Sequence, residues 1–159
     1  MPDTILDKYL TLTGSTTRFL EKLANAPISA KVISQSVEEA DAVILRVSTL
    51  HAGDSAPLLA AESSLSLENL TALEKDALLN SDRPIGDILL SGEGQSFRRE
   101  NVKISSADNH RLRSHIAGAA GAVMLKSFDL WFGDRFIGRL EEVASLASLS
   151  GALKTQSAS

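Results

Sequence analysis

The chain has 159 residues, of which 43% are hydrophobic and 23% are charged, and its formal net charge is −4. This length fits one domain, since domains commonly run ~100–200 residues, and the composition argues against general disorder. The acidic balance argues against a broad electrostatic surface for phosphates, so we expect no nucleic acid partner. The lack of cysteine excludes disulfides, cysteine zinc sites and thiol nucleophiles. Because neither a signal peptide nor an apolar stretch of the ~18 residues needed for a membrane span is visible, we expect a cytoplasmic protein.

The first half of the sequence predicts two helices followed by three strands. Apolar residues at helical spacing predict a short helix over 4–13, and a second helix over 15–24 follows a glycine break. Alternation of apolar and polar residues predicts a strand over 28–37. A more continuously apolar stretch predicts a strand over 42–50, and a glycine turn leads into a returning strand over 57–65.

The second half predicts two further helices and three strands. The spacing of leucines and alanines indicates a helix over 66–79, and a proline in a favourable first-turn position opens a short helix over 84–90. Strand character returns over 96–104. The strongest hairpin signal in the sequence joins a strand over 124–132 to one over 135–143.

Together these elements predict an α+β fold, with a mostly antiparallel sheet of about six strands and flanking helices. We expect a single domain over residues 1–149. The small polar residues that end the chain predict a flexible tail over 150–159. The segment 117–122 is rich in glycine and alanine, and its role is left open.

Common catalytic signatures are absent from the sequence. It contains no GxSxG nucleophile elbow, phosphate-binding loop, dinucleotide fingerprint or HExxH helix. The three histidines, His51, His110 and His115, lack a carboxylate cluster beside them, so surface or loop roles are expected and no metal site is predicted. Candidate chemistry therefore moves to charged residues set within apolar strands.

Arg46 is the first such residue, since it lies within the apolar run 43–47. A guanidinium in that setting needs a partner, because a buried unpaired charge is very unfavourable. One interpretation is a fork that binds a substrate carboxylate through two parallel hydrogen bonds. The other is a structural salt bridge, for example to Glu62, or an outward-facing edge position. The spacing alone favours neither.

Glu141 and Glu142 end the last predicted strand. Side chains alternate across a strand, so one of the two faces opposite to the other. The inward glutamate can hydrogen-bond a substrate hydroxyl or carry a proton. A solvated strand end is the simpler interpretation on these grounds alone.

Five blocks of the sequence, in this order and spacing, resemble the chorismate lyase family, which includes chorismate–pyruvate lyases and more divergent 4-hydroxybenzoate synthases. The similarity covers about residues 5–145. The blocks are residues 12–21 with the strand 30–35, residues 44–46, residues 82–89, residues 98–100, and a glycine hairpin that ends in a glutamate.

The resemblance implies an antiparallel sheet with helices that enclose a ligand pocket. It also implies a cofactor-independent carbon–oxygen lyase, which removes the enolpyruvyl side chain of chorismate as pyruvate and leaves 4-hydroxybenzoate for quinone or other aromatic biosynthesis. No cofactor is expected, because the gain of aromaticity drives the elimination. The expected partners are chorismate and 4-hydroxybenzoate, and the expected assembly is a monomer or small homo-oligomer.

The same resemblance implies roles for four residues. Arg46 is expected to bind a ligand carboxylate, and Thr16 and Ile85 are expected to contact the ligand, largely through their backbones. Glu141 is expected to approach the hydroxyl end and to assist proton movement from the ring. This choice assumes a turn one residue longer than the family's, and Glu142 remains possible. The predicted catalytic residues are thus Arg46 and Glu141.

Two other functions stay open. The effector domains of some bacterial transcription regulators are similar in fold to this family, so a non-catalytic domain that binds a small aromatic acid is an alternative. The short, non-basic segment before the first strand disfavours it. The other possibility is a lyase that forms a different hydroxybenzoate isomer.

Overall fold

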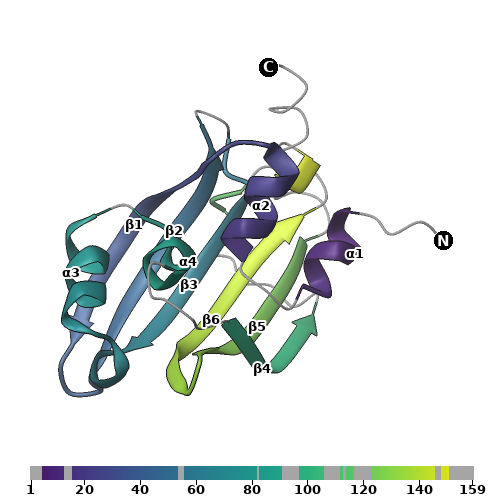
Figure 1. The fold of residues 1–159 in the computed structure, drawn as a ribbon. Coiled ribbons are helices and arrows are strands. Elements are labelled where there is room, and N and C mark those ends of the chain that lie inside the picture. The colour runs from purple at the N-terminus through teal and green to yellow at the C-terminus, as the bar shows by residue number, and fades with distance from the viewer. Residues whose placement is uncertain are drawn as a thin grey trace.

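A computed structural model describes residues 5–12, 16–53, 56–81, 83–90, 97–105, 112, 114–116, 123–145 and 148–150 of the chain. These residues form an α+β fold in which a six-stranded antiparallel sheet carries its helices on one face (Figure 1). The predicted fold class is therefore confirmed.

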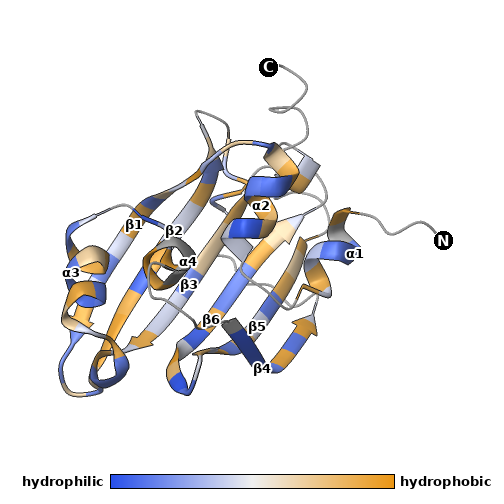
Figure 2. Ribbon diagram, viewed as in Figure 1, coloured by the Kyte–Doolittle hydropathy of each residue, from blue (hydrophilic) through white to orange (hydrophobic). Residues whose placement is uncertain are grey.

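The sheet joins two three-stranded halves of the chain. Its strands are β1 (Ile28–Glu38), β2 (Val43–Ala52), β3 (Leu59–Ser66), β4 (Phe97–Ser105), β5 (Val123–Phe132) and β6 (Arg135–Ser145). They are ordered β1-β2-β3-β6-β5-β4, and every neighbouring pair is antiparallel. Pairing of β3 with β6 joins the two halves in the centre of the sheet, so residues from both halves share one face. Hydrophobic and hydrophilic residues alternate along several strands, as expected where one face is buried (Figure 2).

The helices are α1 (Ile5–Leu10), α2 (Thr16–Ala24), α3 (Ala72–Asn80) and α4 (Ile85–Leu90), with a short 3-10 turn η1 (Leu67–Asn69) before α3. The single helix predicted over 66–79 is therefore wrong in extent. The backbone of Leu70 and Thr71 is extended, and Thr71 caps α3 by accepting from the backbone of Glu74, whose side chain accepts in return. This capping box starts α3 directly after Thr71 and so separates the helix from the preceding turn η1.

Two glycines are required by β6, one in the turn that joins it to β5 and one where it pairs with β3. Gly133 adopts a φ of +62° in the turn between β5 and β6, a conformation that glycine adopts without steric cost. Gly138 lies opposite Leu65 on β3, where an added Cβ would lie only 2.1 Å from the carbonyl oxygen of Ser64. Close approach of β6 to β3 thus depends on Gly138.

Two apolar clusters fill the helix-covered face of the sheet. One packs Tyr9 and Leu20, from α1 and α2, against residues such as Leu50 and Leu59. The other packs α3 and α4 against the opposite ends of the same strands. The two clusters meet in the middle of the helix-covered face, where side chains from both line one pocket.

Parts of the sequence predictions fall outside the described residues. These are the predicted tail beyond residue 150 and the glycine- and alanine-rich segment 117–122. Within the described part of the chain, no helix is long and apolar enough to cross a membrane.

Candidate functional site

A pocket opens at the boundary between the two apolar clusters, between the first turns of α2 and α4. It holds about 50 Å³ of space that a water molecule can reach, and it is partly open to solvent. Its lining is Thr16, Thr17, Ser48, Leu50, Ala61, Pro84, Ile85, Arg99, Phe128, Leu130, Leu140 and Glu142. Apolar walls with a small number of polar groups are typical of small-molecule sites.

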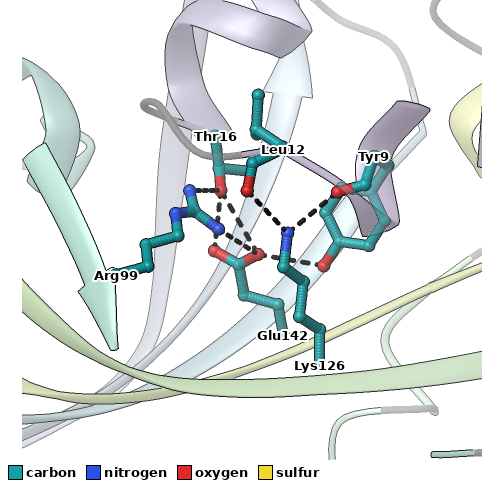
Figure 3. Close-up of polar contacts among 6 residues, drawn as sticks. All are labelled: Tyr9, Leu12, Thr16, Arg99, Lys126 and Glu142. Carbon is teal, nitrogen blue, oxygen red and sulfur yellow. Dashed lines mark hydrogen bonds and ion pairs between the residues drawn. The ribbon is translucent and has the colours of Figure 1, made fainter. Parts of the chain in front are cut away.

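The polar end of this pocket is built around the carboxylate of Glu142, which is buried (Figure 3). The hydroxyl of Tyr9 donates to its Oε1 at 2.9 Å, and the hydroxyl of Thr16 donates to its Oε2 at 3.0 Å. Nη2 of Arg99 donates to the Thr16 hydroxyl oxygen at 2.7 Å, and Nη1 of Arg99 lies 4.0 Å from Glu142 Oε1. Thr16 therefore links the arginine to the glutamate.

Lys126 lies beside this group and is fully buried. Its ammonium donates to the carbonyl oxygen of Tyr9 at 2.8 Å and to that of Leu12 at 3.5 Å. Burial, with the nearby charge of Arg99, lowers the pKa of Lys126 to about 8. Burial and the adjacent Glu142 carboxylate raise the pKa of the Tyr9 hydroxyl well above its usual value. Tyr9 thus remains a neutral hydrogen-bond donor at physiological pH.

The register of β6 decides which of its two glutamates faces the pocket. Glu142 pairs with Ala61 on β3 and Lys126 on β5, both on the helix-covered face, whereas Glu141 pairs with Glu62 and Ser127. The prediction that Glu141 is the inward glutamate is therefore wrong. Leu140 already lines the pocket, so strand alternation sends Glu141 to the other face, where it is half-buried.

Thr16 and Ile85, two of the predicted ligand contacts, both lie in the pocket lining. Thr16 presents its hydroxyl to Glu142, in addition to any backbone contact. Ile85 is the first residue of α4 and follows Pro84, which also lines the pocket. Contact of either residue with a ligand stays a prediction.

Arg46 lies near the pocket but is not among its lining residues. It is 1% exposed, and it shares a face of β2 with Ser48 and Leu50, which do line the pocket. Its Nη2 donates to the carbonyl oxygen of Arg83 at 2.9 Å, just before α4. Burial excludes the outward-facing alternative for Arg46. A salt bridge to Glu62 is also disfavoured, because Glu62 pairs with Val47 and faces the other side of the sheet.

The register also sets the separation of Arg46 from Glu142. Arg46 pairs with Ser63, which pairs with Leu140, and Glu142 lies two residues beyond Leu140. Two strand spacings and two residues of rise place the two Cα atoms roughly 12 Å apart on one face.

Sequence reasoning missed three residues of the polar end, namely Tyr9, Arg99 and Lys126. Lys126 gives the same signal as Arg46, because each is a cation within an apolar strand. Arg99 lay in a block of the family resemblance but received no role. Tyr9 gave no local signal, because only the tertiary fold brings α1 to β6.

Neither of the two histidines that the structure describes lines this pocket. His51 lies within 2.7 Å of the Thr49 hydroxyl, His115 is half-buried, and His110 lies outside the described residues. In the part of the chain that the structure describes, no group of three or more histidine, aspartate or glutamate side chains could hold a metal ion.

Comparison with known proteins places the chain in a family. No curated protein matches it at a significant level. Among solved structures it resembles a transcriptional regulator of the GntR family from Bacillus cereus, with 12% sequence identity and a TM-score of 0.44 over 75% of this chain and 91% of that chain. The family model described as "Chorismate pyruvate-lyase Rv2949c-like" matches residues 10–152, nearly the whole chain. The chain therefore belongs to the Rv2949c-like chorismate pyruvate-lyase family.

Proposed function

We propose that this protein is a chorismate lyase that converts chorismate to 4-hydroxybenzoate and pyruvate. The observation that carries the proposal is the buried Glu142–Thr16–Arg99 group at one end of an otherwise apolar pocket. Membership of the family supports the same reaction class.

The charge of the substrate fits the cations on this face of the sheet. Chorismate carries two carboxylates, one on the ring and one on the enolpyruvyl side chain. Arg46 would bind the ring carboxylate, because a guanidinium matches a carboxylate through paired hydrogen bonds. Arg99 would hold the enolpyruvyl carboxylate near Glu142. The side chains of Phe128, Leu130 and Leu140 would pack against the ring and exclude water.

The reaction breaks one carbon–oxygen bond and one carbon–hydrogen bond. The enolpyruvyl ether leaves its ring carbon, the neighbouring hydroxyl-bearing carbon loses its hydrogen as a proton, and the ring becomes aromatic. The released enolpyruvate takes up a proton and becomes pyruvate. Atoms and electrons balance with no oxidant or reductant.

Glu142 would act at the hydroxyl-bearing carbon. Its carboxylate can accept a hydrogen bond from the ring hydroxyl and can take up the ring proton. The hydroxyls of Tyr9 and Thr16 hold that carboxylate in one orientation. Arg99 would stabilise the negative charge that develops on the departing enolate. Held in this pose, the substrate needs little further reorganisation to react.

A coupled assay tests the proposal. Purified protein would be incubated with chorismate without added metal, and pyruvate and 4-hydroxybenzoate would be measured together. Equal amounts of both products support the proposal. Pyruvate with a different hydroxybenzoate isomer would keep the lyase but change its specificity. Neither product, with a raised Tm in the presence of 4-hydroxybenzoate, would contradict catalysis and indicate a binding domain.

A further inference from the structure

Lys126 is the single buried lysine among the described residues, and it lies directly beside the proposed catalytic glutamate. It is 0% exposed on β5 and pairs across the sheet with Glu142 on β6. Side chains of directly paired residues lie on the same face, about 5 Å apart at their Cβ atoms. The ammonium therefore belongs to the surroundings of Glu142 although it does not line the pocket.

The contacts of Lys126 are made with the end of α1. Its Nζ donates to the carbonyl oxygens of Tyr9 and Leu12 and lies 4.9 Å from the centre of the Tyr9 ring (Figure 3). Tyr9 donates its hydroxyl to Glu142, and the chain that continues from Leu12 reaches α2 at Thr16, the second hydroxyl donor to Glu142. Lys126 thus binds backbone carbonyl oxygens at Tyr9 itself and at Leu12, four residues before Thr16 in the sequence.

A purely structural role explains this lysine poorly. A cation near the last carbonyls of a helix is favourable, but Lys8 already supplies one in the last turn of α1, in an exposed position. Burial of Lys126, with the pKa of its ammonium lowered to about 8, disfavours the folded state at neutral pH. An apolar side chain of similar length would fill the same space without that penalty. Buried cations with shifted pKa values beside a cleft are common at functional sites.

Resting on the proposed lyase function, we infer that Lys126 is a positioning residue for the reaction. By binding the carbonyl oxygens of Tyr9 and Leu12, it fixes the end of α1, so that the hydroxyls of Tyr9 and Thr16 hold the Glu142 carboxylate in its reactive orientation. Lys126 acts through these residues and does not touch the substrate.

The test compares Lys126→Met with Lys31→Met in the full-length protein. Methionine keeps the length and the apolar stem of lysine but removes its charge and donors. Lys31 is an exposed lysine on β1 and controls for the loss of a lysine from the sheet. For each protein, Tm, kcat and KM for chorismate, and the ionisation of tyrosine by absorbance would be measured. Tyr9 is the single tyrosine of the chain, so this absorbance reports on it alone.

Lys126→Met is expected to keep its Tm within about 3 °C of the wild type, since relief from burying a charge offsets the lost hydrogen bonds. Its kcat should fall by about tenfold to a hundredfold with little change in KM, because the carboxylate is misplaced and binding is not lost. Tyr9 should ionise at lower pH than in the wild type, since it gains access to water. Lys31→Met should match the wild type in all three measurements.

Three results would overturn the inference. One is an unchanged kcat in Lys126→Met. Another is a loss of activity that follows a large fall in Tm, which would make Lys126 a structural residue. The third is ionisation of Tyr9 at the same pH as in the wild type or higher, because Tyr9 would then have stayed in place. If the wild type forms no product from chorismate, the proposed function fails, while the tyrosine titration still tests the contact of Lys126 with α1.

The pH dependence of kcat in the wild type gives a second test should Lys126→Met not fold. The charged and titratable groups that face Lys126 are Glu142 on β6, Arg99 on β4 and Tyr9 on α1. Loss of the ammonium proton should lower kcat as the pH rises through about 8. A kcat that stays constant from well below to well above this pH would contradict a role for the charge.

Discussion

Replacement of Glu142 by glutamine tests the proposed chemistry most directly, because the chain supplies its own control in Glu141. Glu142→Gln and Glu141→Gln make the same chemical change at adjacent positions. The first lies on the helix-covered face inside the pocket, and the second lies on the opposite face and is half-buried. Any difference between them reports on the face and not on the substitution.

The structure sets the size of each effect. Glutamine keeps one oxygen that can accept from Tyr9 or Thr16, but it removes the charge 4.0 Å from Arg99. Hydrogen bonds to charged groups contribute about 1.5–3 kcal/mol, so with one acceptor kept we expect Glu142→Gln to lose about 2 kcal/mol of stability. That corresponds to a fall in Tm of about 4–8 °C for a chain of this size. Glu141 is half-buried and has contacts of its own, so Glu141→Gln serves as the control for kcat and not for stability.

The effect on catalysis should be much larger than the effect on folding. Loss of a positioned acid–base group lowers rates by about 10²–10⁴-fold, so Glu142→Gln should lose kcat by that factor. Glu141→Gln should keep the wild-type kcat. Urea denaturation and the pyruvate assay would be run on both variants at a temperature where each is folded. Normal turnover by Glu142→Gln, or a loss confined to Glu141→Gln, would refute the assignment.

Three further predictions follow from contacts elsewhere on the sheet. Arg46→Ala should lower kcat/KM for chorismate by roughly 100-fold, and Arg46→Lys should not restore it, since lysine lacks the planar guanidinium fork. Unchanged turnover of Arg46→Ala in a steady-state assay would remove Arg46 from the site. Burial alone would raise the pKa of Glu74, but hydrogen bonds from Arg135 at 2.6 and 2.9 Å and from Thr71 hold it below 4.5. Because the folded pKa is depressed, this stabilisation is present above pH 4.5 and is lost as the pH falls through the folded value, so the Tm difference between wild type and Glu74→Gln should shrink on acidification below pH 4.5. Gly138→Ala should lower the free energy of unfolding by about 1–3 kcal/mol or more in urea, since its Cβ meets the Ser64 carbonyl oxygen at 2.1 Å, whereas a stable variant would show that β6 can shift away from β3.

The secondary structure was largely predictable because each strand of this sheet has a local signature. The hairpin predicted over 124–132 and 135–143 corresponds to β5 and β6, and the strand predicted over 28–37 corresponds to β1. The helix over 66–79 was predicted as one element because its leucines have helical spacing throughout. The structure instead starts α3 at Ala72, where Thr71 and Glu74 satisfy each other's backbone groups. Hydrophobic periodicity alone does not locate the start of a helix that a capping box sets.

The prediction that Glu141 faces the pocket was wrong because of the geometry of the strand and not because of the chemistry of the residue. Counting from a turn gives a position along the chain, and an error of one residue reverses the face on which a side chain lies. β6 contains such an irregularity, since Leu130 pairs with Gly138 while the next residue, Trp131, pairs with Phe136. Ile137 is thus an extra residue on β6. Cross-strand partners identify the face without counting, and Glu142 stands opposite Ala61 and Lys126.

The polar end of the pocket escaped prediction because it is assembled from three separate parts of the chain. Tyr9 and Thr16 come from the N-terminal helices, Arg99 from an edge strand, and Lys126 and Glu142 from the last hairpin. Only pairing of β3 with β6 and packing of α1 and α2 over the sheet bring them together. The sequence does show one signal, which is a cation within an apolar strand, where burial of the charge is unfavourable. Arg46 in β2 and Lys126 in β5 are both buried, both bind backbone carbonyl oxygens, and both lie on the face that holds the pocket. Burial of each charge lowers stability, and the two cations serve the pocket in different ways. Arg46 is proposed to bind a substrate carboxylate, and Lys126 is proposed to position the hydroxyl donors to Glu142.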